Sequence, residues 1–325
     1  MNQRIRRRRF LAMLLAGMIS PVVRAQAYPA RPIRIIVPFP PGGAVDFYAR
    51  IVQPALTEKL GQPIVIDNRP GASGMIGADL VAKSPPDGYT LLLGNIASLA
   101  INVGLYAKMP YNPVTDFTPI THTVDVNYVL VVHPSVPART VRELIEYARA
   151  NPGKLAFGSA GSGSLPHLAG ELFKSLTGVQ MTHVPYKGGG PMVSDLVGGT
   201  IQLVIADQAN LMPHVKSGNL RALAVASPAR SPGYPELPTI AEAGVPGFQA
   251  VAWNGLVAPA GVSPDIVKRL NAVFVETMAT PAVYARLIEG GLDPVGDPPE
   301  SFARFIPAEI AKWSKIAKDV GARAD

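Results

Sequence analysis

From residue 28 onward, short apolar runs rich in β-branched residues alternate with segments whose apolar residues recur every three or four positions. Residues 33–37 (IRIIV) form the first such run, and residues 47–60 carry apolar side chains at helical spacing. The alternation continues with a strand at 64–67, a helix at 75–82 and a strand at 90–93. This order is typical of βαβ units on a largely parallel sheet, so it predicts an α/β half over residues 28–125.

A second series of alternating elements begins with the apolar run at residues 128–132 (YVLVV). Thr140 and Glu143 have the spacing of a capping box, which predicts a helix that continues to Ala150. The remaining predicted elements are strands at 155–157, 181–184, 201–205, 220–226 and 250–258, with helices between them, and terminal helices at 264–278, 281–289 and 301–320.

Two extended segments, residues 126–134 and 248–259, connect the two series. They imply that the chain leaves a first lobe (28–125 and 251–325), builds a second lobe (126–250) and returns. Ligands of open parallel sheets bind beyond the carboxyl ends of the strands. We therefore expect a two-lobed α/β fold with mixed, mostly parallel sheets and a ligand cleft between the lobes.

The first 27 residues have the composition of a cleavable export signal. A basic run ends at Arg9, an apolar stretch covers residues 10–23, and small residues stand at Ala25 and Ala27. The apolar stretch is too short for a stable membrane-spanning helix. We expect cleavage near Ala27 and a periplasmic protein. Residues 7–11 (RRRFL) also fit the twin-arginine pattern, which leaves both that route and the general secretory route open.

Charge and composition narrow the function further. The formal net charge is +7, and because six arginines and no acidic residue lie in residues 1–27, removal of that segment leaves +1. A nearly neutral body gives no indication of a nucleic-acid partner. The chain contains no cysteine. Thiolate nucleophiles, disulfides, cysteine-ligated zinc and thiolate-held iron–sulfur clusters are therefore excluded.

The segment between the first predicted strand and its helix is a candidate ligand loop. Its two consecutive glycines allow the backbone to approach a ligand closely, and the start of the following helix favours an anion. Asp46 also fits a cap at the helix start. The candidate contacts are Phe39, Pro41, Gly42, Gly43, Ala44, Val45 and Asp46.

The second half repeats this arrangement with a serine-rich loop after the strand at 155–157. Its hydroxyl groups and glycine N–H groups can form a second anion cradle. The alternative is a flexible surface loop. The candidate contacts are Ser159, Ala160, Gly161, Ser162, Ser164 and, in the first turn of the next helix, His167. A third candidate, Asp207, ends the strand at 201–205 and can accept a hydrogen bond from a ligand or cap a helix.

The loops do not match the common catalytic templates. None of the loop serines stands in G-x-S-x-G, and neither a nucleotide-binding glycine motif nor H-E-x-x-H occurs. The five histidines lack the spacing of metal ligands. We therefore expect no enzymatic activity, no metal and no cofactor.

Several segments together resemble the periplasmic solute-binding receptors of tripartite tricarboxylate transporters, also called Bug receptors. The resemblance covers nearly the whole chain after residue 27. It is carried by residues 28–33, 37–46 (VPFPPGGAVD), 68–74 (NRPGASG), 86–91 (PDGYTL), 184–188 (VPYKG), 213–218 (PHVKSG), 220–225 (LRALAV) and 253–259.

The resemblance implies a two-lobed fold of the type II periplasmic-binding-protein class that closes on a small organic acid, held mainly by backbone amides and ordered water. The ligand loops it implies are residues 39–46, residues 159–164 and the strand end at Asp207. Val45 stands where Thr or Ser is common in the family, which removes one hydroxyl contact.

We therefore predict an exported, monomeric receptor that captures a mono- or dicarboxylate, an aromatic acid or an amino acid and delivers it to integral-membrane transporter subunits. Two alternatives remain: a periplasmic sensor for a signalling kinase, and a serine hydrolase that uses a loop serine with His167 or His214 as its base.

Overall fold

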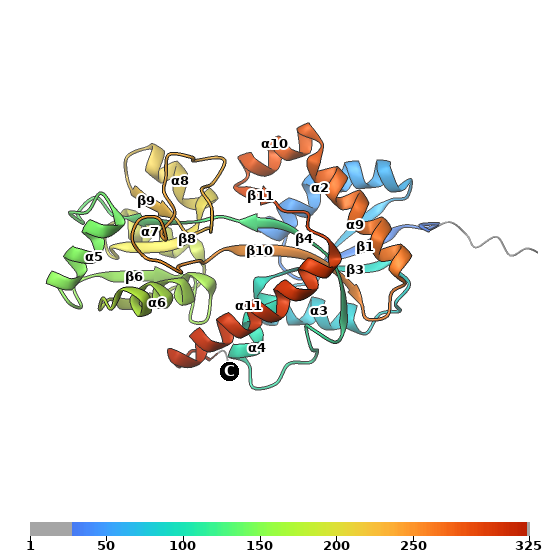
Figure 1. Ribbon diagram of the computed structural model, residues 1–325, viewed down its shortest axis with the longest axis horizontal. Helices are drawn as coiled ribbons and strands as arrows, with labels where there is room; N and C mark the ends of the chain where they lie inside the picture. Colours follow the sequence, from blue (N-terminus) through green and yellow to red (C-terminus); the bar gives the residue numbers. More distant parts are fainter. Residues whose placement is uncertain (1–27, 324–325) are drawn as a thin grey trace, which may run out of the picture.

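The computed structural model describes residues 28–323 and shows two lobes joined by long strands (Figure 1). The expected export signal, with its cleavage position near Ala27, lies outside the described residues. Within residues 28–323, every helix is too short or too polar to span a bilayer.

The first lobe contains a six-stranded sheet in the order β11-β4-β10-β3-β1-β2. Its strands are β1 (Ile33–Val37), β2 (Ile64–Asn68), β3 (Thr90–Asn95), β4 (Phe117–Val126), β10 (Ala252–Pro259) and β11 (Leu292–Pro294). Its helices are α2 (Ala44–Leu60), α3 (Met75–Ala82), α4 (Asn102–Leu105), α9 (Pro264–Ala279), α10 (Pro281–Glu289) and α11 (Pro299–Asp319), with single turns η1 (Ala72–Gly74) and η2 (Ala97–Ile101).

The second lobe contains a five-stranded sheet in the order β7-β6-β8-β5-β9. Its strands are β5 (Tyr128–Val132), β6 (Ala156–Ser159), β7 (Thr182–Pro185), β8 (Leu203–Asp207) and β9 (Arg221–Val225). Its helices are α5 (Val141–Ala150), α6 (Leu165–Thr177), α7 (Gly189–Val197) and α8 (Gln208–Lys216). Along the chain, the first sheet passes to the second between Val126 and Tyr128, and the chain returns to the first sheet between Val225 and Ala252.

The two-lobed α/β fold with mixed sheets is confirmed, although parallel pairs do not outnumber antiparallel ones in either sheet. The parallel pairs are β1-β2, β1-β3, β6-β7 and β6-β8. Every antiparallel pair contains β4, β5 or β10, the strands that carry the chain between the lobes. The chain leaves the first lobe along β4 and returns along β10, so these two neighbouring strands run in opposite directions and pair antiparallel.

Local sequence determines where several of these elements begin and end. Thr140 accepts a hydrogen bond from the Glu143 N–H at the start of α5, as the capping box predicts. Gly61 and Gly178 end α2 and α6 in the left-handed conformation that glycine adopts most readily.

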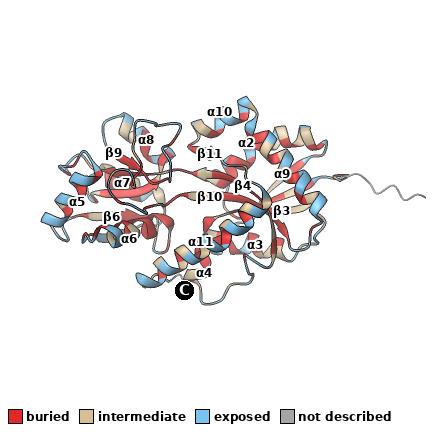
Figure 2. Cartoon of the chain, in the orientation of Figure 1, coloured by how far each residue is buried: buried red, intermediate tan, exposed pale blue. Residues whose placement is uncertain are grey.

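One apolar core runs through both lobes. It joins Ile36 and Leu92 of the first sheet to Leu130 and Phe157 of the second, with Trp253 of β10 between them. Figure 2 shows the strands that cross between the lobes as buried. The crossings between the lobes are therefore a packed part of the molecule, with α11 lying along them (Figure 1).

Candidate ligand-binding site

The first candidate loop, residues 39–46, leaves the carboxyl end of β1 and enters α2. Residues 40–43 are exposed. The chain turns at Gly42, whose φ of +87° is open to glycine without strain. From the neighbouring strand β2, the Asn68 side chain donates through Nδ2 to the Phe39 carbonyl at 3.1 Å. The pairing of β1 with β2 thus fixes the start of the loop.

Asp46 holds this loop from inside the lobe. Its side chain is only 2% exposed, and its Oδ2 accepts from the Gly42 N–H at 2.9 Å and from Arg50 Nε at 2.8 Å. Its Oδ1 accepts from Asn68 Nδ2 at 3.0 Å. Burial opposes ionisation, but the hydrogen bonds from Arg50, Gly42 and Asn68 outweigh it and lower the pKa of Asp46. The carboxylate therefore shapes the loop and is already fully bonded.

The N–H groups that remain open lie at the start of α2. Gly43 is the N-cap residue, and its carbonyl accepts the first helical bond from Phe47. The N–H groups of Gly43, Ala44 and Val45 precede that bond and have no carbonyl of the helix to accept them. The Val45 side chain is buried in the core of the lobe, so only its backbone is available.

The serine-rich loop, residues 159–164, is largely bonded to itself. The Gly161 carbonyl accepts from Ser164 Oγ at 2.6 Å, from the Ser164 N–H at 3.1 Å and from Ser159 Oγ at 3.1 Å. Ser159 is fully buried and also accepts from the Gly161 N–H at 3.2 Å. Of the three hydroxyl groups, that of the exposed Ser162 is left facing solvent. Ala160 is half-buried between these contacts.

Two histidines lie behind this loop. His167 accepts at Nδ1 from the Gly163 N–H at 3.0 Å, and His183 Nε2 lies 2.7 Å from Ser159 Oγ. Burial, and secondarily the neighbouring His167, lower the pKa of His183 to about 4. From the sequence, His183 was noted only as one of five histidines without the spacing of metal ligands. Its place beside Phe157 follows from the parallel register of β6 and β7, two strands that were predicted.

Asp207 stands at the end of β8 and caps α8. Its Oδ1 accepts from the Ala209 N–H at 2.8 Å. Burial raises the pKa of Asp207, although the N–H groups of Ala209 and Asn210 oppose the shift. Of the two roles that the sequence left open, the structure therefore contains the helix cap.

The start of α8 faces the first lobe across a hollow of about 390 Å³. Ala209 lies close to Gly291, where a Cβ would stand 3.6 Å from the Ala209 Cβ. The Gln208 side chain is buried and lines this hollow, and its Oε1 has no hydrogen-bond partner. Residues of both lobes line the hollow: Gln208, Ala209, Met212, Pro213, Lys216, Gly233, Tyr234, Ile288, Glu289 and Gly291.

The segment from η2 to α4 links the two candidate loops. On one side, the side chains of Ser98 and Phe39 both lie close to Gly74. A Cβ added at Gly74 would stand 3.2 Å from Ser98 Cβ and 3.1 Å from Phe39 Cζ. On the other, the Leu105 side chain stands 2.8 Å from where a Cβ of Gly163 would be. The first loop and the serine loop thus lie at opposite ends of one segment of the first lobe.

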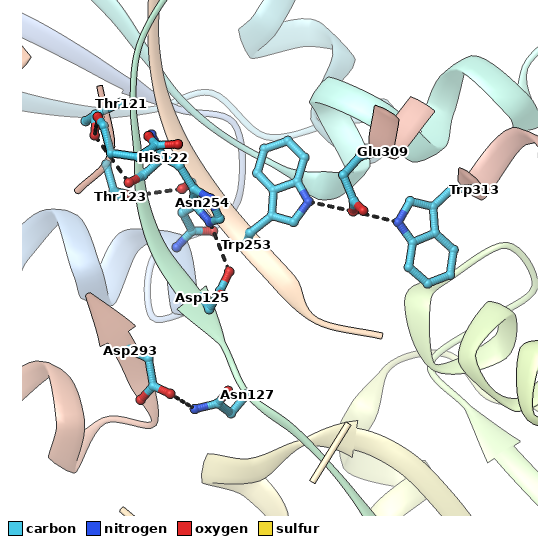
Figure 3. Close-up of polar contacts among 11 residues, drawn as sticks. Thr121, His122, Thr123, Asp125, Asn127, Trp253, Asn254, Asp293, Glu309 and Trp313 are labelled. Carbon is cyan, nitrogen blue, oxygen red and sulfur yellow. Dashed lines mark hydrogen bonds and ion pairs between the residues drawn. The ribbon is translucent and has the colours of Figure 1, made fainter. Parts of the chain in front are cut away.

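The crossings between the lobes carry separate groups of polar contacts (Figure 3). Asn127, between β4 and β5, donates through Nδ2 to Asp293 Oδ2 at 2.5 Å, and its carbonyl accepts from the Gln208 N–H at 2.8 Å. On the other crossing, Glu309 Oε2 accepts from Trp253 Nε1 at 3.0 Å and from Trp313 Nε1 at 2.8 Å. The Asn127 contacts thus join both lobes, whereas the Glu309 contacts hold α11 to β10 within the first lobe.

The geometry provides binding groups without a catalytic set. Ser159 and His183 are within hydrogen-bond distance, but Ser159 is fully buried, so a substrate has no access to its hydroxyl. His167 is bonded to the Gly163 N–H instead of to a serine. Among residues 28–323, no three histidine or acidic side chains gather as metal ligands. Lys187, in the loop that follows β7, is exposed.

Comparison with known sequences gives a consistent result. Residues 48–322 match the family described as tripartite tricarboxylate transporter family receptor. The protein BugT of Bordetella pertussis is 42% identical over 309 residues, which cover 95% of this chain and 94% of BugT. A protein from the tcbD-tcbE intergenic region of Pseudomonas sp. strain P51 is 42% identical over 316 residues, covering 96% of this chain and 94% of its own.

Solved structures show the same architecture. Rpa4515 of R. palustris, solved with adipate, superposes with a TM-score of 0.78 at 42% identity, covering 91% of this chain and 99% of its own. MatC (Rpa3494) of Rhodopseudomonas palustris, solved with bound malate, superposes with a TM-score of 0.73 at 34% identity, covering 89% and 99%.

Proposed function

The chain belongs to the tripartite tricarboxylate transporter receptors, a family of solute-binding receptors and not of enzymes, and on that premise we propose that it captures one small carboxylate between its lobes. The observation that carries the proposal is the start of α2, where exposed residues 40–43 lead into N–H groups that the helix leaves open. An anion placed there gains hydrogen bonds and the favourable end of the helix dipole.

The chemistry of the loops supports a carboxylate. The two ligands named in the solved relatives, adipate and malate, are both dicarboxylates. In this chain, the two candidate loops contain glycine and serine where a guanidinium clamp would otherwise fix a carboxylate. We propose that Gly43, Ala44 and Val45 contact the ligand through their N–H groups, and that Ala160 and Ser162 contact it from the second lobe.

The other candidate residues then support these contacts. Asp46 fixes the turn at Gly42, so that the neighbouring N–H groups point outward. The Phe39 ring lies beside Gly74, and Pro41 is exposed in the same loop. Gly161 and Ser164 close the serine loop on itself, with Ser159 and His167 beneath it. Asp207 orients the start of α8.

Closure of the lobes is how a bound ligand changes the receptor. A ligand that bonds to both lobes favours the closed form, because only that form makes both sets of contacts. Closure changes the surface presented to a membrane partner. We propose that this partner consists of integral-membrane transporter subunits, and that the receptor acts as a monomer in the periplasm after removal of residues 1–27. Replacing Arg7 and Arg8 by lysine distinguishes the two export routes. The change blocks export of the protein by the twin-arginine route and leaves export by the general secretory route intact.

The proposal is tested by isothermal calorimetry with adipate, malate, benzoate and glutamate on three proteins: wild type, Ala44→Pro and Ala44→Ser. Ala44 is the first residue of α2, a position that proline fits, and Gly43 before it has the extended ψ of 168° that precedes proline most easily. Ala44→Pro thus deletes one open N–H while the helix keeps its start. Ala44→Ser keeps the N–H and is the matched control.

We expect at least one carboxylate to bind wild type, with a Kd about tenfold or more higher in Ala44→Pro and within about threefold in Ala44→Ser, since a hydrogen bond to a charged group contributes about 1.5–3 kcal/mol. Thermal unfolding of the three proteins should agree within about 3 °C. If none of the four acids binds wild type, carboxylate capture is wrong. If both variants bind alike, the start of α2 is not the site.

A further inference from the structure

A pair of stacked imidazoles lies beneath the serine loop. His167, in the first turn of α6, and His183, on β7, have ring centroids 3.9 Å apart and planes inclined by 19°. The His183 ring also stacks on Phe157 of β6, with centroids 5.0 Å apart. His167 is 7% exposed. Three neighbouring elements of the second lobe thus hold the two rings in place.

Each imidazole is bonded to a different end of the loop. His167 Nδ1 accepts from the Gly163 N–H near its carboxyl end, and His183 Nε2 contacts Ser159 Oγ at its amino end. Between these two anchors, the Gly161 carbonyl is held by Ser164 Oγ. The shape of the serine loop therefore depends on the contacts that His167 and His183 make with its two ends.

The contact at Gly163 fixes the protonation state of His167. A backbone N–H can only donate, so Nδ1 must carry a lone pair, and the proton of the neutral ring lies on Nε2. A second proton on the ring would point an N–H at an N–H. Because His183 lies directly against His167, a positive charge on either ring also opposes a charge on the other.

We propose that the His167–His183 pair sets the shape of the serine loop, and that protonation of His167 in mild acid releases the loop and weakens ligand binding. This proposal rests on the proposed function, since it takes the serine loop as the second lobe's contribution to the ligand site. His167 is then a positioning residue that acts through Gly163 and does not touch the ligand.

The surroundings of the pair support this behaviour. Within residues 28–323, the charged groups that act on it are Lys174, which opposes protonation of both rings, and Glu171, which favours protonation of His167 and is itself paired with Lys174 at 2.8 Å. β6 contributes the uncharged ring of Phe157. Burial, the largest effect, lowers the pKa of His167 below its usual 6.5. A released loop exposes the ring and restores the ordinary pKa, so acid below pH 6.5 favours release.

Two substitutions separate the acceptor from the ring. In His167→Asn, the Oδ1 atom occupies the same branch of the side chain as Nδ1, accepts a hydrogen bond and does not titrate. In His167→Phe, the stack on His183 is kept and the acceptor is lost. His133→Asn is the matched control, because His133 follows β5 and bonds Ser135, away from the loop.

Adipate binding, or binding of whichever panel acid binds wild type, is measured for all four proteins from pH 7.5 to pH 5.0. Titration of the ligand's own carboxylates affects every protein equally and cancels in the ratio of Kd values. At pH 7.5 we expect His167→Asn within about threefold of wild type and His167→Phe about tenfold weaker. Toward pH 5.0, wild type should weaken at least about threefold relative to His167→Asn, while His133→Asn follows wild type. A constant ratio between wild type and His167→Asn overturns the proposal.

An NMR titration of the ligand-free protein tests the same device without a ligand. The Gly163 amide resonance should move with the titration of the His167 ring in wild type and stay in place in His167→Asn. A Gly163 amide that ignores the titration of His167 overturns the proposal. If no acid binds wild type, the proposed function fails, and this titration still decides whether the pair controls the loop.

Discussion

Replacing Glu309 tests whether its carboxylate holds α11 against β10. Glu309 lies on α11 and is 7% exposed, and its Oε2 accepts from the indoles of Trp253 and Trp313 (Figure 3). Both indoles are at most 1% exposed. In Glu309→Ala, two buried N–H groups lose their acceptor. In Glu309→Gln, the amide oxygen can still accept from both.

The expected cost follows from the number of donors left unpaired. A buried donor without a partner costs about 1–3 kcal/mol, and the substitution also spares the protein the burial of a carboxylate. We therefore expect Glu309→Ala to lower the free energy of unfolding by about 2–4 kcal/mol, which corresponds to a fall in Tm of about 3–6 °C for a chain of this size. Glu309→Gln should cost about 1 kcal/mol or less.

Urea unfolding followed by tryptophan fluorescence is the natural assay, since the chain contains two tryptophans and Glu309 contacts both. The emission of the folded protein should change in Glu309→Ala and stay close to wild type in Glu309→Gln. A cost below about 1 kcal/mol for Glu309→Ala would show that the indoles find other acceptors. Equal costs for the two variants would mean that the charge matters and the acceptor does not.

Further predictions concern the two acidic residues of the candidate loops. Asp46→Asn should lower the free energy of unfolding at pH 7. The lowered pKa of Asp46 contributes stability that is present above about pH 4 and is lost as pH falls through the folded-state pKa. Urea titrations at pH 3–7 should therefore show the stability difference from wild type shrinking in acid. Asp207→Asn should be as stable as wild type or more stable at pH 7. Burial raises the pKa of Asp207, so wild type loses stability as pH rises through the raised pKa. Because the asparagine keeps the cap on Ala209, its advantage should vanish near pH 4, and an advantage that persists there would contradict this account.

Much of the fold follows from periodicity, whereas β4 shows where periodicity is insufficient. Residues 128–132 and 281–289 were predicted with the bounds that the structure has. Most of β4 was missed because its interior contains Thr121, His122 and Thr123 where a buried strand usually has apolar residues. These side chains are buried and bonded within the lobe, for example Thr123 Oγ1 to the Asn254 carbonyl at 2.9 Å. Such pairing spans more than a hundred residues and leaves no local pattern.

The candidate site was predictable to the level of loops and not of atoms. The glycines, the serines and the following helices identify both loops from sequence. Which groups remain available depends on contacts from other elements: Gly42 gives its N–H to Asp46, and Gly163 gives its N–H to His167. Asn127 and Glu309 were missed because their partners are brought to them only by the crossings.

The two loops therefore differ in how they are held, and this difference determines which loop responds first as pH falls. The first is fixed by an ionised carboxylate, Asp46, which stays charged below its usual pKa because Arg50 and two further donors bond to it. The second is fixed by neutral imidazoles. Their pKa values are lowered, and that of His183 lies at about 4. As pH falls, the pair under the serine loop begins to gain protons before Asp46 does. Acid thus acts first on the second lobe's side of the cleft, while the N–H groups at the start of α2 keep their arrangement.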